Sequence, residues 1–167
     1  MEIRKRPALK LKKTPLENVL NIISLLVYIG SVIHLFMHWS SLPNRVPIHY
    51  NLVGEIDKWG SKEDIFFLPI TGAILWIGLT ILEKFPHLYN YMVVLTEENI
   101  ERQYKNASTM INVVKNEILL YIAYCSWKDV NIAYGRDVVL EAWDLPIFLI
   151  ILFGSIGFFI LRSFRLQ

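Results

Sequence analysis

Residues 145–161 read LPIFLIILFGSIGFFIL, a run without a charged side chain that decides the class of this protein. A helix of about 20 mostly apolar residues spans the hydrocarbon core of a bilayer. Asp144 can cap such a helix, Pro146 suits its first turn, and Arg162 follows its last apolar residue. The run therefore predicts a transmembrane helix over residues 145–161.

The composition of the whole chain also indicates a membrane protein. Of its 167 residues, 54% are hydrophobic and only 19% are charged, whereas soluble domains contain about a quarter charged residues. The one cysteine, Cys125, excludes a disulfide framework, a CxxC pair or a zinc knuckle within a single chain. The composition favours a membrane protein over a soluble domain.

Three more segments have the length and composition of transmembrane helices, at about residues 16–39, 65–82 and 110–127. The first begins with a capping box formed by Thr14 and Glu17, with a proline between them at the first helical position. We therefore predict an all-α membrane protein with four transmembrane helices, folded as a single domain over residues 1–167.

The distribution of Lys and Arg predicts how this domain is oriented. Six of these residues fall within the first thirteen positions, directly before the first span. No small-residue cleavage site follows, so we expect this span to remain attached as a signal anchor. With the N-terminus inside, the inner segments carry eleven Lys and Arg residues and the outer loops carry five. Because Lys and Arg accumulate on the cytoplasmic side, we predict a membrane protein with an N-in, C-in orientation.

The inner loop before the third span has its own helical pattern. Thr96 can cap a helix whose first turn carries Glu97 and Glu98, where acidic groups meet the positive end of the helix dipole. We expect a cytoplasmic helix extension over residues 97–109 that continues into the third span.

The outer loop, residues 40–64, contains the stretch LPNRVPIHYNLVGEIDKWGSK from Leu42 to Lys62. The apolar residues from Val46 to Leu52 alternate with other residues at the period of a short strand. Gly54 and Gly60 suit turns that require a positive φ, and Trp59 is expected to pack onto the helix ends or to lie at the membrane interface. We predict that this loop folds into a cap on the outer ends of the spans.

The loop also resembles a known domain. The residues that carry the resemblance are Leu42, Pro43, Val46, Pro47, His49, Asn51, Gly54, Asp57, Trp59, Gly60 and Lys62. Their pattern is similar to a bacterial membrane domain of unassigned function that forms the N-terminal half of SdpI-type immunity and signalling proteins and also occurs alone in short chains. The third span is similar too, with Lys115 and Glu117 in the stretch KNEILLYIAY. The resemblance covers roughly residues 16–135, and the chain lacks the second, C-terminal membrane domain of SdpI.

The resemblance implies a bacterial plasma-membrane protein with a role in toxin-peptide immunity or membrane signalling. It supplies no catalytic residues. The residues that we expect to take part in recognition all lie in the outer loop: Pro47, His49, Asn51, Gly54, Asp57, Trp59 and Lys62. His49, Glu55 and Asp57 could form a metal or proton site on the outer face. The favoured interpretation is that Glu55 and Asp57 form turns and pair with Lys58 or Lys62.

The histidines permit a metal site, although a structural role is the stronger interpretation. His34 and His38 are four residues apart and share a helical face, and His49 could approach them from the loop. Near a membrane interface, however, histidine more often forms hydrogen bonds with the backbone or a neighbouring helix. We therefore predict no bound metal and no cofactor.

The third span contains four polar residues, Asn112, Lys115, Asn116 and Glu117. Ionisable groups at membrane depth usually face a bundle interior or a cavity. Asn112 and Asn116 share a face and could bond to another helix, whereas Lys115 could extend its stem to the inner headgroups. Helix association is favoured over a substrate path for this cluster.

Enzyme signatures such as GxSxG, HExxH, a phosphate loop and GxGxxG do not occur in the sequence. We expect a non-catalytic integral membrane protein with an SdpI-like immunity or signalling role, in which the outer loop, residues 42–62, is the recognition element. The alternative is a small accessory subunit of a transporter or another membrane complex, and an oligomeric four-helix transporter comes third. The expected partners are the lipid bilayer and a peptide toxin or another membrane protein, but not nucleic acid. The sequence also permits association of the chain with further copies of itself as an oligomer.

Overall fold

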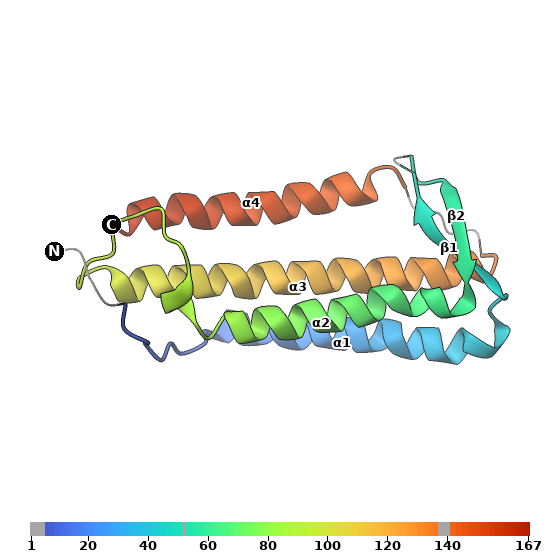
Figure 1. The fold of residues 1–167 in the computed structure, drawn as a ribbon, viewed down its shortest axis with the longest axis horizontal. Helices are drawn as coiled ribbons and strands as arrows, with labels where there is room; N and C mark the ends of the chain where they lie inside the picture. Colours follow the sequence, from blue (N-terminus) through green and yellow to red (C-terminus); the bar gives the residue numbers. More distant parts are fainter. Residues whose placement is uncertain (1–5, 52, 137–140) are drawn as a thin grey trace.

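The computed structural model describes residues 6–51, 53–136 and 141–167. Four helices run lengthwise and alternate in direction (Figure 1). They are α1 (Pro15–His38), α2 (Phe67–Leu82), α3 (Ile100–Ala133) and α4 (Asp144–Arg165). A two-stranded sheet joins α1 to α2 at one end of the bundle, here called the hairpin end, and the start of α1 and the end of α4 lie at the opposite end. The small sheet is an addition to the predicted all-α class.

Among the described residues, three helical segments are long and apolar enough to cross a membrane: Pro15–Ser41, Lys62–Leu82 and Asp144–Arg165. They contain the predicted spans 16–39, 65–82 and 145–161, which are extended by the short 3₁₀ helices η1 (Trp39–Ser41) and η2 (Lys62–Phe66). The predicted span 110–127 lies within α3, one continuous helix of 34 residues. α3 is not among the segments that are apolar enough to cross a membrane, because the middle of this helix carries the four polar residues described above.

The bundle is organised around α3, since every extensive contact between helices involves it. In Figure 1 α3 lies between α4 on one side and α1 and α2 on the other. Its buried positions include Gln103, Asn112 and Lys115, whereas the outward faces of its neighbours are apolar, with Met37 76% exposed and Ile150 69% exposed. Polar side chains inside and apolar side chains outside are the arrangement expected of a bundle surrounded by lipid.

The predicted capping box at the start of α1 is present. Thr14 Oγ1 accepts a hydrogen bond from the Glu17 N–H, and the Glu17 carboxylate accepts one from the Thr14 N–H. This reciprocal pair satisfies two of the backbone donors that a helix start leaves free.

The inner helix extension begins three residues later than predicted, at Ile100 rather than at residue 97. Thr96 Oγ1 accepts a hydrogen bond from the Asn99 N–H at 3.3 Å, and Asn99 Oδ1 accepts one from the Thr96 N–H at 2.9 Å. These bonds close a turn over Glu97 and Glu98, so the two glutamates precede the helix. A short 3₁₀ helix, η3 (Pro86–Leu88), lies between α2 and this turn.

The outer loop contains the predicted strand, β1 (Arg45–Tyr50), which pairs in antiparallel fashion with β2 (Ile56–Ser61). Gly54 has the positive φ that was expected, 85°. Leu52, which was assigned to the same alternating pattern, lies outside the described residues.

The expectation for Gly60 was wrong. Gly60 lies inside β2 and does not belong to the glycines with positive φ among the described residues. A glycine is needed at this position because the Ile48 and Asp64 side chains approach its backbone closely. An added Cβ would meet the Ile48 side chain at 2.8 Å and the Asp64 carboxylate.

A small apolar core attaches the hairpin to the helices. Its buried members are Leu35, Leu42, Val46, Ile65 and Val130, which come from α1, the loop, β1, η2 and α3. Trp59 is not one of them, since it is 48% exposed on the surface of the hairpin. The loop is therefore a folded cap, as predicted, but its anchor is Val46.

A contact between α2 and α3 leads to the first prediction. A Cβ at Gly72 would lie 2.9 Å from the Ile122 Cγ2 atom, whereas a Cβ at Gly78 on the same helix would meet nothing within 4 Å. We expect Gly72→Val to lower the free energy of unfolding by about 1–3 kcal/mol through overpacking. The matched change Gly78→Val should have little effect. Thermal unfolding of the detergent-solubilised protein measures both, and equal effects would contradict this packing.

Candidate functional site

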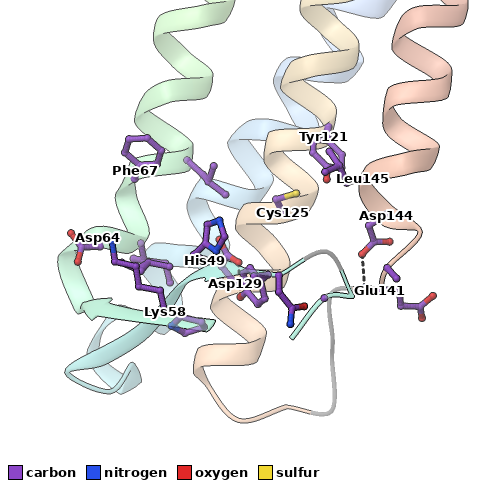
Figure 2. Close-up of a pocket in the computed structure, with 18 of the residues that line it drawn as sticks. His49, Lys58, Asp64, Phe67, Tyr121, Cys125, Asp129, Glu141, Asp144 and Leu145 are labelled. Atoms are coloured by element: carbon purple, nitrogen blue, oxygen red, sulfur yellow. Dashed lines mark hydrogen bonds between the residues drawn. The ribbon is translucent and has the colours of Figure 1, made fainter. Parts of the chain in front are cut away.

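A cavity of about 830 Å³ lies where the hairpin meets the helices, and we call it the hairpin cavity. Figure 2 shows it between α2 and α4, with α3 behind and the hairpin across its end. The strand β1 contributes Pro47, Ile48, His49 and Tyr50, while α2 contributes Phe67 and Leu68 and α4 contributes Leu145, Pro146 and Leu149. The walls are thus mostly apolar, and the volume falls in the range of sites for small ligands.

One face of α3 supplies polar groups to the cavity. Tyr121, Cys125 and Asp129 recur every four residues, which places them on one side of the helix, and all three line the cavity. None of the three was predicted to belong to a site, and Cys125 was noted only as the single cysteine. Their spacing was visible in the sequence, but the neighbours that would enclose them were not.

Asp129 is the half-buried carboxylate of this group. The Tyr50 hydroxyl donates a hydrogen bond to Asp129 Oδ1 at 2.9 Å, which ties the hairpin to α3. Burial raises the pKa of Asp129 to about 6, although the bond from Tyr50 favours the charged form. Burial and the neighbouring Asp129 carboxylate also raise the pKa of Tyr50. Among the described residues no Lys, Arg or His forms an ion pair with Asp129.

The rim of the cavity carries a second polar pair. His49 Nδ1 lies 2.6 Å from Asp57 Oδ1, and both side chains are exposed. Lys58 also lies at the rim and is exposed. The predicted pairing of Glu55 and Asp57 with Lys58 or Lys62 was wrong, because Asp57 bonds to His49 and Glu55 accepts a hydrogen bond from Asn51 Nδ2 at 2.9 Å.

The predicted recognition residues divide between cavity and surface. Pro47, His49, Asn51 and Gly54 line the cavity, whereas Asp57, Trp59 and Lys62 do not.

Two of these residues have a clear structural role. Asn51 Oδ1 accepts hydrogen bonds from the N–H groups of Val53 and Glu55, which holds the hairpin turn. Lys62 Nζ lies 4.5 Å from the centre of the Trp39 ring, a cation–π contact between the loop and the end of α1.

The structure does not bring the three candidate histidines together. The His34 and His38 rings lie 4.3 Å apart, and His38 Nδ1 lies 2.9 Å from the His34 carbonyl oxygen. His49 faces Asp57 on the hairpin instead. Within residues 6–51, 53–136 and 141–167, no three His, Cys, Asp or Glu side chains are grouped so that they could hold a metal ion.

A polar core fills the middle and the opposite end of the bundle. The Lys115 side chain is 0% exposed, and its Nζ donates to Glu83 Oε2 at 2.6 Å and to Thr80 Oγ1 at 3.0 Å. The suggestion that Lys115 reaches the headgroups was therefore wrong. Lys13, before α1, approaches the other Glu83 oxygen at 3.1 Å.

The two asparagines of the predicted cluster join three helices, as expected. Asn112 and Asn116 both donate to Asn21 Oδ1 on α1, at 3.1 and 2.9 Å. Asn116 Oδ1 accepts from the Trp76 indole N–H on α2 at 3.0 Å. Hydrogen bonds between helices are the usual use of such residues in membrane bundles.

Two further carboxylates belong to the polar core. Glu17 has a side chain that is only 1% exposed, and it accepts from Lys105 Nζ at 2.6 Å and from Thr109 Oγ1 at 2.6 Å. From the sequence, Glu17 was predicted only as part of the capping box. Glu117 accepts a hydrogen bond from Ser155 on α4, while its buried Oε2 atom has no partner among the described residues.

Residues 26–73 match a protein family described as a domain of unknown function (DUF1648). The matched segment contains most of α1, the whole hairpin and the beginning of α2. Neither the curated proteins nor the solved structures contain a significant match to the chain.

The pair Lys115–Glu83 provides a test of the polar core. Removing one partner of a buried ion pair leaves an uncompensated charge and typically costs about 3–5 kcal/mol. We expect Glu83→Gln to destabilise the solubilised protein by about this amount, because the buried ammonium of Lys115 then loses its carboxylate. The double variant Glu83→Gln/Lys115→Met should recover part of the loss.

Unfolding midpoints of the two variants and of the single Lys115→Met variant complete the double-mutant cycle. Glu98→Gln, a change at an exposed glutamate in the turn before α3, serves as the control. Additive losses from the two single changes would show that the groups are not coupled.

Proposed function

We propose that the chain is a four-span membrane protein in which α3 is the remaining transmembrane helix. α3 runs alongside the three apolar helices, and the four helices alternate in direction (Figure 1). If the apolar helices span a bilayer, α3 spans it too. Its 34 residues extend over about 50 Å, which exceeds the hydrocarbon thickness of a bilayer. The excess of Lys and Arg at the opposite end supports an N-in, C-in orientation with the hairpin outside.

The polarity of α3 is compatible with this topology because of where its charges lie. Lys115 is completely buried against Glu83 on α2, and Glu117 bonds to Ser155 on α4. The charged groups therefore face neighbouring helices rather than lipid, which is how ionisable residues are accommodated at membrane depth.

For its biochemical role, we propose ligand recognition at the outer face of a bacterial plasma membrane, in an SdpI-like immunity or signalling protein without catalytic activity. The observation that carries this proposal is the hairpin cavity. The hairpin does not simply connect two spans but forms one wall of a mostly apolar cavity with three helices. The family match covers the hairpin together with the adjoining parts of the two helices that it joins.

A path to the inner side supports a signalling role. Asp129 in the cavity and Lys105 near the opposite end belong to the same continuous helix, α3. Lys105 holds Glu17 at the start of α1, and Lys115 holds Glu83 at the end of α2. A ligand that shifted α3 would act on these ion pairs directly.

The topology can be tested with single cysteines in a Cys125→Ala background. A cysteine at Glu55, in the hairpin turn, should react in intact cells with a thiol reagent that cannot cross membranes. Cysteines at Glu98 and Gln167, which lie at the opposite end, should react only after the cells are permeabilised. The reverse pattern of labelling would overturn the proposed orientation.

The functional role can be tested in a strain that lacks the gene. If the protein confers immunity, this strain should stop growing in medium conditioned by its parent, because the cavity that captures the toxic peptide is missing. Wild-type protein should restore growth. Leu149→Trp, which fills the cavity, should not, although the protein still accumulates in the membrane.

Ile150→Trp is the matched control, since the neighbouring Ile150 is 69% exposed and does not line the cavity. Equal rescue by both tryptophan variants would rule out the cavity as the recognition site. Unimpaired growth of the deletion strain, together with a membrane protein that copurifies in fixed ratio, would favour the accessory-subunit alternative.

A further inference from the structure

The carboxylates of this protein differ in how their charge is balanced. Glu17 pairs with Lys105, Glu83 with Lys115, and Asp144 with Lys128, each at 2.6 Å. Asp129 has only the Tyr50 hydroxyl, and in the described part of the chain it forms no ion pair. A carboxylate in a partly dry site without a counter-ion is costly unless a cation reaches it.

The open side of Asp129 faces the cavity. Tyr50 bonds to Oδ1, and Oδ2 accepts no hydrogen bond from the described residues. Asp129 is among the residues that line the cavity, and Figure 2 labels it on α3, near the place where the hairpin crosses that helix. The neighbouring acid Asp144 is already neutralised by Lys128, so Asp129 is the half-buried anionic group that remains available inside the cavity.

The cavity walls around the Asp129 carboxylate are apolar and suit the apolar part of a ligand. Phe67 and Leu68 on α2 face a cavity that α4 closes with Leu145, Pro146 and Leu149. The two helices make no extensive contact with each other, and Phe67 is 69% exposed, so the apolar surface continues from the cavity to the outside of the bundle. A ligand with one positive charge and an otherwise apolar surface fits both the Asp129 carboxylate and the apolar walls.

The strand β1 favours a peptide over other cationic amphiphiles. The consecutive residues 47–51 follow the wall of the cavity. In a sheet of only two strands each strand keeps one edge with unpaired backbone groups, and an extended peptide can bond to such an edge.

We infer that the hairpin cavity binds an apolar peptide segment that places one lysine or arginine side chain against Asp129. This inference rests on the proposed recognition function and names the chemistry of its ligand. The described residues contain no group of three His, Cys, Asp or Glu side chains that could hold a metal ion, so the inference names an organic cation.

The test uses full-length protein in nanodiscs of zwitterionic phosphatidylcholine, so that the lipid itself does not attract cations. Two peptides with a neutral coumarin label on the N-terminus are compared by fluorescence anisotropy: coumarin-Leu-Ala-Lys-Ala-Leu-amide and the same peptide with norleucine in place of lysine. The charge-assisted hydrogen bond to Asp129 is the contact that the norleucine peptide lacks. We therefore expect the lysine peptide to bind at least about tenfold more tightly.

Asp129→Asn keeps the shape of the side chain and an acceptor for Tyr50, and it should abolish the preference for lysine. Glu141→Gln, which removes an exposed carboxylate from the same cavity, should preserve it. A preference that survives in Asp129→Asn, or that disappears equally in Glu141→Gln, would overturn the inference.

Failure of this inference can be distinguished from failure of the proposed function. If both peptides bind equally to the wild type and both are excluded by Leu149→Trp, the cavity recognises peptides but not their charge. If neither peptide binds, the inference is wrong, and the growth experiment alone decides the function.

A measurement on the wild-type protein covers the case in which Asp129→Asn does not fold. A water-soluble carbodiimide should join the peptide ammonium to the Asp129 carboxylate as an amide, and mass spectrometry should locate the link. A link only to Glu141 or Asp64 would contradict the inferred position.

Discussion

The ammonium group of Lys115, enclosed between helices, is the constraint on which the arrangement of the bundle depends. A fully buried cation must have an anion and further acceptors within reach. Glu83 supplies the anion from the end of α2, and Thr80 supplies the acceptor one turn earlier. These contacts determine how α2 lies along α3. Asn112 and Asn116, on either side of Lys115, then bring α1 to the same place through Asn21.

The same constraint explains why α3, the most polar of the helices, is the central one. Its neighbours need only one polar stripe each and can leave the rest of their surface apolar. α4 packs less extensively on α3 than α1 and α2 do. It is attached through side-chain bonds such as those of Ser155 and Ser163. At the hairpin end α4 and α2 lie apart, and the hairpin cavity occupies the space between them.

Much of the fold could be predicted because its signals are local. The three apolar helices, the capping box at Thr14, the strand β1 and the turn at Gly54 each depend on a few consecutive residues. Gly60 could not be predicted, because its role depends on Ile48 across the hairpin and on Asp64. The partner of Lys115 could not be predicted either, since Glu83 is 32 positions away and looked like the polar end of a span. Asp129 was missed because four separate elements enclose it.

The polarity of α3 has a consequence for the way the protein is made. A helix centred on Lys115, Asn116 and Glu117 is unfavourable in lipid by itself, since a single lysine at the centre of a helix costs about 2.5–3.5 kcal/mol on insertion scales. In the proposed four-span topology, α1 and α2 are synthesised before α3, so Asn21 and Glu83 would be in place when α3 is inserted. These two residues would then provide polar partners for α3 within the membrane. The order of the helices along the chain would thus set the order in which they pack, with α4 packing last against α3.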